Sequence, residues 1–149
     1  MISYNIDIQY PISIDGSDTA LLQHQFDNGV LYQFDNFKWW QYRTLQLQVT
    51  GAKTTFTVMT ADNTHTIRFT LLTQNGDEHI ELKMESDLVV LFEKKDLFGL
   101  MTRKIKEYIG FERLSLAQAR EYLVLFLQQD LAALEHVYRT DLQQYTANA

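Results

Sequence analysis

The chain has 149 residues, of which 46% are hydrophobic and 21% are charged, values that are typical of one folded domain rather than of a disordered segment. Its formal net charge of −6 argues against binding to nucleic acid, because such binding needs a basic surface that neutralises phosphates. The absence of cysteine excludes disulfides, thiolate nucleophiles and cysteine metal sites, and it fits a cytoplasmic protein. We expect neither a secretory leader nor a membrane span, since no stretch approaches roughly 18 apolar residues.

The first segment, residues 2–14, alternates between apolar and polar side chains. This period of two predicts a strand with one buried face. Pro11 cannot donate a hydrogen bond to a neighbouring strand, so we expect the strand to lie at a sheet edge or to break there.

Hairpin turns with matched apolar pairs predict a meander of eight antiparallel strands over the first two thirds of the chain. Gly51 favours a type II′ turn that pairs Val49 with Thr54, and Asn75-Gly76 favours a type I′ turn that pairs Leu71 with Ile80. A three-residue loop with a left-handed Gly29 pairs Phe26 with Val30, and Gly51 is also expected at positive φ. The predicted strands are residues 2–14, 19–26, 30–34, 37–50, 53–61, 65–74, 78–85 and 88–93.

The last third is predicted to be helical. One helix is expected from the capping residue Asp96 to near Gly110, and it would cover the last strand, whose two faces are both apolar. A second, long helix is expected over residues 115–145, where Ser115 and Gln118 are spaced as a capping box. At 1.5 Å per residue this helix would span roughly 45 Å, so part of its apolar stripe should project beyond the sheet.

These elements predict a single α+β domain over residues 1–149, with an antiparallel eight-strand meander in residues 1–94 and a helical segment in residues 96–147. The meander would form either a strongly curved sheet or a closed barrel that resembles calycin-like barrels in outline, followed by two C-terminal helices of which the last is long. A fold of this kind does not by itself define a function.

A first candidate site is a ligand pocket inside the barrel. The parity of the strand 37–50 points Trp39, Gln41 and Arg43 inward, and the predicted register brings His24 and Tyr32 beside them. An arginine near a histidine and a tyrosine could bind the head of an organic acid. Two alternatives stay open: a bulge near Trp40 would turn Arg43 to water, or an Asp or Glu of the chain would pair with it.

A second candidate site is a surface for a protein partner. The same parity points Trp40 and Tyr42 outward, and exposed aromatic residues are enriched at protein interfaces, unless the C-terminal helices cover them. The far end of the long helix carries Tyr138, Leu142 and Tyr145, which we expect to contact a second copy or another protein.

Metal, cofactor and catalytic sites are not indicated. His79 and Glu81 share a strand face, but a third metal ligand is not evident, and the sequence has neither a glycine-rich phosphate loop nor a nucleophile elbow. The basic segment KKDLFGLMTRKIKEY could lie on an anionic membrane, but we favour a helix whose apolar face covers the last strand and whose lysines are solvated.

The sequence therefore favours a non-enzymatic binding protein that acts through protein contacts, of the inhibitor, immunity-protein or adaptor type. The alternative is a carrier of a small amphipathic organic acid in the barrel cavity. An enzyme, as a third class, has no motif to support it.

Overall fold

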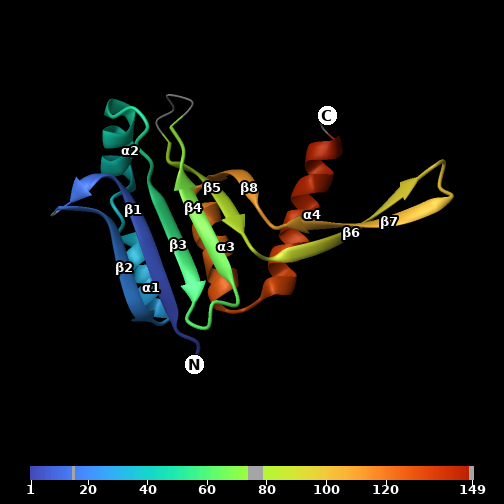
Figure 1. Ribbon diagram of the computed structural model, residues 1–149, viewed down its shortest axis with the longest axis horizontal. Helices are drawn as coiled ribbons and strands as arrows, with labels where there is room; N and C mark the ends of the chain where they lie inside the picture. Colours follow the sequence, from blue (N-terminus) through green and yellow to red (C-terminus); the bar gives the residue numbers. More distant parts are fainter. Residues whose placement is uncertain (15, 74–78, 148–149) are drawn as a thin grey trace.

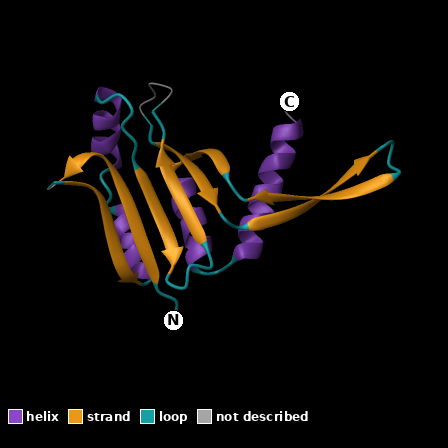
Figure 2. Ribbon diagram, in the orientation of Figure 1, coloured by secondary structure: helices purple, strands orange, loops and turns teal. Residues whose placement is uncertain are grey.

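The computed structural model describes residues 1–14, 16–73 and 79–147, and it shows an α+β fold with eight antiparallel strands and four helices, two of them C-terminal (Figures 1 and 2). The strands are β1 Tyr4–Ile14, β2 Ser17–Gln25, β3 Thr55–Thr60, β4 Thr66–Leu71, β5 Glu81–Ser86, β6 Val89–Asp96, β7 Met101–Tyr108 and β8 Phe111–Ser115. The helices are α1 Asp27–Asp35, α2 Trp39–Gln48, α3 Leu116–Leu127 and α4 Leu131–Ala147.

Six strands form one open sheet, in the order β2-β1-β3-β4-β5-β8, and among the described residues β6 pairs with β7 alone. Because β2 and β8 end this sheet on opposite sides, the sheet is open, which agrees with the predicted alternative of a strongly curved sheet and not with that of a calycin-like barrel. Helices α1 and α3 lie against one face of the sheet, and the β6–β7 hairpin extends away from it as a separate ribbon (Figure 1). We call this hairpin, residues 89–108, the arm and the rest of the chain the body.

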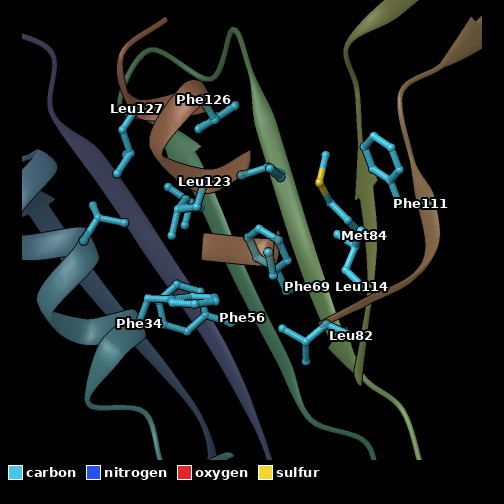
Figure 3. Close-up of a cluster of buried hydrophobic side chains, with 14 of the residues drawn as sticks. Phe34, Phe56, Phe69, Leu82, Met84, Phe111, Leu114, Leu123, Phe126 and Leu127 are labelled. Atoms are coloured by element: carbon cyan, nitrogen blue, oxygen red, sulfur yellow. The ribbon is translucent and has the colours of Figure 1, made fainter. Parts of the chain in front are cut away.

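The core lies between the sheet and the helices. The alternation that predicted the first strand is confirmed, since Tyr4, Ile6 and Ile8 are all buried on the helix-facing side. Phe56 and Phe69 pair across β3 and β4, and the ring of Phe34 from α1 packs on both with centroid distances of 5.5 Å (Figure 3). Aromatic edge-to-face contacts of this kind stabilise beyond the area that they bury.

The first strand does not break at Pro11, because β1 continues to Ile14, but Pro11 lies beyond the stretch that pairs with β3. The pairing of β1 with β3 ends at Gln9, and the register between β1 and β2 shifts between Gln9 and Ile14. Downstream, β4 and β5 pair Leu71 with Leu82 rather than with Ile80. This register is displaced by two residues from the predicted one, which keeps every side chain on its expected face. The predicted Asn75-Gly76 turn lies outside the described residues.

Two predicted strands, residues 30–34 and 37–50, are wrong, because this region forms α1 and α2. Val30 and Phe34 are four residues apart, and both are buried on the helical face of α1. The apolar residues of this segment fit the period of two of a strand as well as the period of 3.6 of a helix. The helix forms because it packs its apolar face against the sheet. Gly29 accordingly lies within α1 without the predicted positive φ, whereas Gly51 has the predicted positive φ of 79°.

The predicted helix from Asp96 to Gly110 is also wrong, because this segment supplies the end of β6, a tight turn and β7. The single helix expected over residues 115–145 is two helices, separated at Gln128–Asp130, where Gln129 has a φ of 57°. Asp130 accepts a hydrogen bond from the backbone N–H of Ala133 and so caps the start of α4. The predicted capping box of Ser115 and Gln118 is confirmed at the start of α3.

The predicted division at residue 94 is likewise wrong, since α1 and α2 lie within the strand-rich part and β7 and β8 within the part expected to be helical. The eight strands and two C-terminal helices are correct in number and class. Some of these elements, however, are formed by other segments of the chain than those predicted.

Candidate interaction site

The five residues predicted to line a ligand pocket do not come together. His24 lies on the edge strand β2, Tyr32 on α1, and Trp39, Gln41 and Arg43 on α2. His24, Tyr32 and Gln41 are exposed and Trp39 is buried in the core, while Arg43 is half-buried and not without a partner in the chain. The cavity of a closed barrel, on which the carrier hypothesis depended, is not formed by the open sheet.

The two aromatic residues of α2 that were predicted to bind a partner, Trp40 and Tyr42, differ in their exposure. Trp40 is 53% exposed, as expected, but Tyr42 is buried with its ring 4.8 Å from that of Phe37. The outward prediction for Tyr42 assumed a strand, whereas in a helix Trp39 and Tyr42 are three residues apart and share one face.

The predicted stripe of the last helix is used inside the molecule. Tyr138 is buried and Leu142 packs against the core, while the side chain of Tyr145 lies outside the described residues. Because the chain turns between α3 and α4, the stripe does not project beyond the sheet as the single helix expected over residues 115–145 would. The apolar stripe on which we based the expectation of oligomerisation through this helix is therefore occupied by contacts within the chain.

The arm is the most distinctive surface feature of the structure. Its eight residue pairs run without a register shift from Val89–Tyr108 to Asp96–Met101. Eight residues of antiparallel strand rise by about 26 Å. Neither strand pairs with any other described strand, and Figure 1 shows the far end of the arm well clear of the sheet and the helices.

Helix α4 anchors the base of the arm. The hydroxyl of Tyr138 donates a hydrogen bond of 2.9 Å to Glu107 on β7, and a guanidinium nitrogen of Arg139 donates one of 2.9 Å to the carbonyl of Leu91 on β6. The guanidinium of Arg139 also lies 4.6 Å from the ring centroid of Phe92, a cation–π contact. Burial, followed by the hydrogen bond and charge of Glu107, raises the pKa of Tyr138 to about 12.

The tip of the arm presents apolar side chains to solvent. Their exposed fractions are 62% for Leu97, 104% for Phe98, 84% for Leu100 and 58% for Met101. Leu97 and Phe98 have φ angles of 53° and 56°, in the left-handed region that side-chain-bearing residues rarely adopt. Each costs about 1–2 kcal/mol relative to a residue suited to that conformation. The tip thus combines exposed apolar surface with backbone strain.

The arm is also basic, whereas the body is acidic. Its cationic residues are Lys94, Lys95, Arg103, Lys104 and Lys106, and its acidic residues are Glu93, Asp96 and Glu107. The arm therefore has a formal charge of +2 in a chain of −6, which leaves −8 on the body. Because of this separation of charge, an acidic partner would be attracted to the arm and repelled by the body.

Two clefts of the body are weaker candidates. One of about 390 Å³ lies beside the base of the arm and includes His65, Asp87 and Glu135. Asp87 already accepts a hydrogen bond of 2.8 Å from the backbone N–H of Thr66. A second, of about 260 Å³, is bordered by Asp35 and Arg120, which form an ion pair with each other. Asp87, Asp35 and Arg120 thus already have partners within the protein, and we do not regard either cleft as a candidate catalytic site.

Metal sites and membrane-spanning helices are both absent from the part of the chain that the structure describes. Within residues 1–14, 16–73 and 79–147, no group of three His, Cys, Asp or Glu residues could hold a metal ion. His79 is exposed, and Glu81 forms a 3.0 Å ion pair with Arg113. Among those residues there is also no helix of the length and apolar character needed to cross a bilayer.

Comparison of the chain with protein-family models, with curated proteins and with solved structures finds no match. Sequence reasoning singled out the basic segment but assigned it to a helix. The sequence did carry a signal for a hairpin, because the turn residues Asp96 and Gly99 lie in the segment DLFGLM, between two basic pairs, KK and RK.

Proposed function

We propose that this chain is a non-enzymatic binding protein that acts through protein contacts, with the arm as its binding element. The observation that carries the proposal is the group of four exposed apolar side chains at the end of an arm that α4 anchors at its base. Contiguous apolar surface at such a position is typical of interaction sites. Its removal from water lowers the free energy, and at the tip only a bound partner can remove it from water.

The tip residues contribute little to the fold. Phe98 is fully exposed and Leu97 is 62% exposed, and the left-handed backbone of both residues is destabilising. A turn that served only to connect β6 and β7 would be more stable with glycine or asparagine at these positions. Large apolar side chains at a strained, exposed turn are therefore best explained by a partner that receives them.

The expected partner is a protein with an apolar pocket and an acidic surrounding surface. The pocket would take Phe98 and its apolar neighbours, and the acidic rim would face the cations of both strands, which raises the rate of association. Glu93, which lies opposite Lys104 on the arm, argues against an anionic membrane as the partner, because the lipid surface would repel its carboxylate. An inhibitor, immunity protein or adaptor would use such an element.

Site-specific photo-crosslinking tests the proposal. A photo-reactive phenylalanine analogue replaces Phe98, and the protein is irradiated in extract of the organism that encodes the chain. We expect one cross-linked protein product that excess unlabelled wild type suppresses. The variant Leu97→Asn/Phe98→Asn should fail to suppress it, because asparagine keeps the left-handed turn and removes the apolar surface.

The matched control is Trp40→Ala, which removes an exposed aromatic side chain from the body and should suppress the product as well as wild type does. Suppression by the tip variant but not by Trp40→Ala would contradict the proposal and move the binding surface to α2. Co-sedimentation with vesicles of phosphatidylserine and phosphatidylcholine supplies a further check. Sedimentation that depends on Leu97 and Phe98 would replace the protein partner with a lipid surface.

A further inference from the structure

Strand β7 of the arm has a free edge. A two-stranded hairpin is only marginally stable in water, and a third strand or a packed helix stabilises it. Helix α4 supports the base of the arm at Leu91, Phe92 and Glu107, and beyond this base Figure 1 shows the arm clear of the body. All residues of β7 except Ile105 are exposed, and β7 pairs with β6 alone among the described strands.

The hydrogen bonds of the arm show which backbone groups of β7 point outward. The N–H of Ile109 donates a bond of 2.8 Å to the carbonyl of Leu88, so in the next pair toward the tip the N–H and C=O groups point away from the partner strand. The two kinds of pair alternate without a register shift, so the outward groups of β7 include those of Thr102, Lys104 and Lys106. Among the described residues, these groups have no hydrogen-bond partner elsewhere in the chain. No residue of β7 has a positive φ, so the edge is regular along its length.

The free edge of β6 is less suited to a further strand. There the outward carbonyl of Leu91 already accepts a hydrogen bond from Arg139 of α4. The two strands also differ in charge. β6 carries two lysines and two acidic residues and has no formal net charge, whereas β7 carries three cations and one glutamate and has a formal charge of +2. An acidic strand would therefore pair with β7 rather than with β6.

The lysines of β7 restrict which strand can pair with it. Lys104 and Lys106 lie on one face of the arm, because side chains at alternate positions of a strand share a face. The same face carries Lys95 and Glu93 of β6, so it has three lysines, one glutamate and a formal charge of +2. Lysine at an edge repels a second copy of β7, which has the same charge. It attracts a strand whose acidic side chains stand at alternate positions.

We infer that β7 binds an extended acidic segment of the partner protein as a third, antiparallel strand, with Asp or Glu at alternate positions beside Lys104 and Lys106. The inference rests on the proposed function, since it specifies how the partner that receives the tip is held along the arm. Backbone hydrogen bonds to the edge supply affinity in this mode of binding, and the side chains supply specificity. The antiparallel direction is the more stable one for each residue paired.

Two N-methylated peptides test the inference directly. Both are eight-residue peptides of alternating threonine and glutamate, methylated on the backbone nitrogens of either the threonines or the glutamates. In the inferred pairing the glutamate N–H groups face β7 and the threonine N–H groups face away. We expect the threonine-methylated peptide to bind at least tenfold more tightly than the glutamate-methylated one, by fluorescence anisotropy of labelled peptide. Equal affinities, or no binding of either peptide at millimolar concentration, would overturn the inference.

Charge reversal on the arm supplies a second readout with the threonine-methylated peptide. We expect Lys104→Glu/Lys106→Glu to weaken its binding at least tenfold. The matched control is Lys38→Glu/Lys53→Glu, which makes the same change in net charge at two exposed lysines of the body and should leave the affinity unchanged. Circular dichroism confirms that both variants are folded. An equal loss in the two variants would overturn the inference, because it would show attraction by net charge alone.

The photo-cross-linking assay at Phe98 separates this inference from the proposed function. We expect Lys104→Glu/Lys106→Glu to need at least tenfold more protein than wild type to suppress the cross-linked product. Suppression equal to that of wild type would overturn the inference and leave the proposed function intact. Peptide binding as expected, but without any cross-linked product that depends on the tip, would support the strand site and contradict the proposed function.

Discussion

The body buries its large apolar side chains, whereas the tip of the arm exposes them to solvent. In the body, large residues such as Phe34, Phe56 and Phe69 are at most 1% exposed, and they pack on one another between the sheet and the helices. At the tip of the arm, Phe98 is fully exposed. The contrast separates residues whose burial stabilises the fold from residues whose exposure is of use only to a partner.

The same contrast holds for the backbone. Outside the tip, the described residues at positive φ are glycines or polar residues, namely Gly16, His24, Gly51, Asn63 and Gln129. Glycine adopts this region at little cost, and asparagine and histidine are enriched there. At the tip the same conformation is held by Leu97 and Phe98, followed by Gly99. The body thus uses residues suited to its turns, whereas the arm tolerates strain at the residues that it exposes.

The largest effect is expected from the core of the body. Phe56→Ala removes a fully buried ring that lies 5.5 Å from Phe34 and 5.4 Å from Phe37 between centroids. We expect the free energy of unfolding to fall by about 3–5 kcal/mol, from lost burial and the cavity that remains. Urea denaturation measures this change. A loss below about 1 kcal/mol would show that the packing in Figure 3 does not carry the stability of the body.

A smaller effect is expected where the arm meets the body. The pKa of Tyr138 is raised to about 12, above the value near 10 of the unfolded chain, by burial and by Glu107. Its contribution to stability is therefore complete below pH 10 and is lost as the pH rises from 10 toward 12. We expect the wild type to lose about 1–2 kcal/mol more than Tyr138→Phe over this interval, in urea titrations at several pH values. Parallel pH profiles for the two proteins would contradict the buried contact with Glu107.

A third effect, of about 1 kcal/mol, distinguishes two glycines. Gly51→Val should destabilise the body by at least this amount, because φ at Gly51 is 79° and valine adopts that region poorly. Gly29→Ala should instead stabilise by about 0.5–1 kcal/mol, because Gly29 lies in helix α1, provided that the nearby Gln25 side chain moves. Thermal unfolding of both variants measures the difference, and a destabilising Gly29→Ala would argue against the helix.

Much of the fold could be predicted from local patterns. Alternation in residues 2–14 predicted β1 and its buried face, and the Ser115 capping box predicted the start of α3. Residues 30–50 were misassigned because their apolar positions fit a strand and a helix equally well. Only contacts distant in sequence, such as Phe34 with Phe56 and Phe69, decide between the two.

The candidate site was harder to predict, for two physical reasons. Leu97, Met101, Ile105 and Tyr108 have helical spacing, so the segment of the arm satisfied a pattern that it does not adopt. The turn between α3 and α4 has neither glycine nor proline, so Asp130 was the only local sign that the helix ends there. With one helix in place of two, Tyr138 was assigned to a partner rather than to the base of the arm.

The central claim, that the tip of the arm serves binding and not folding, is tested most directly by the stability of one variant. Leu97→Asn/Phe98→Asn removes two exposed apolar side chains and places asparagine where the backbone is left-handed. The account predicts that its free energy of unfolding in urea equals that of the wild type or exceeds it by up to about 2 kcal/mol. A decrease of more than about 1 kcal/mol would show that these side chains support the fold, and it would contradict the claim.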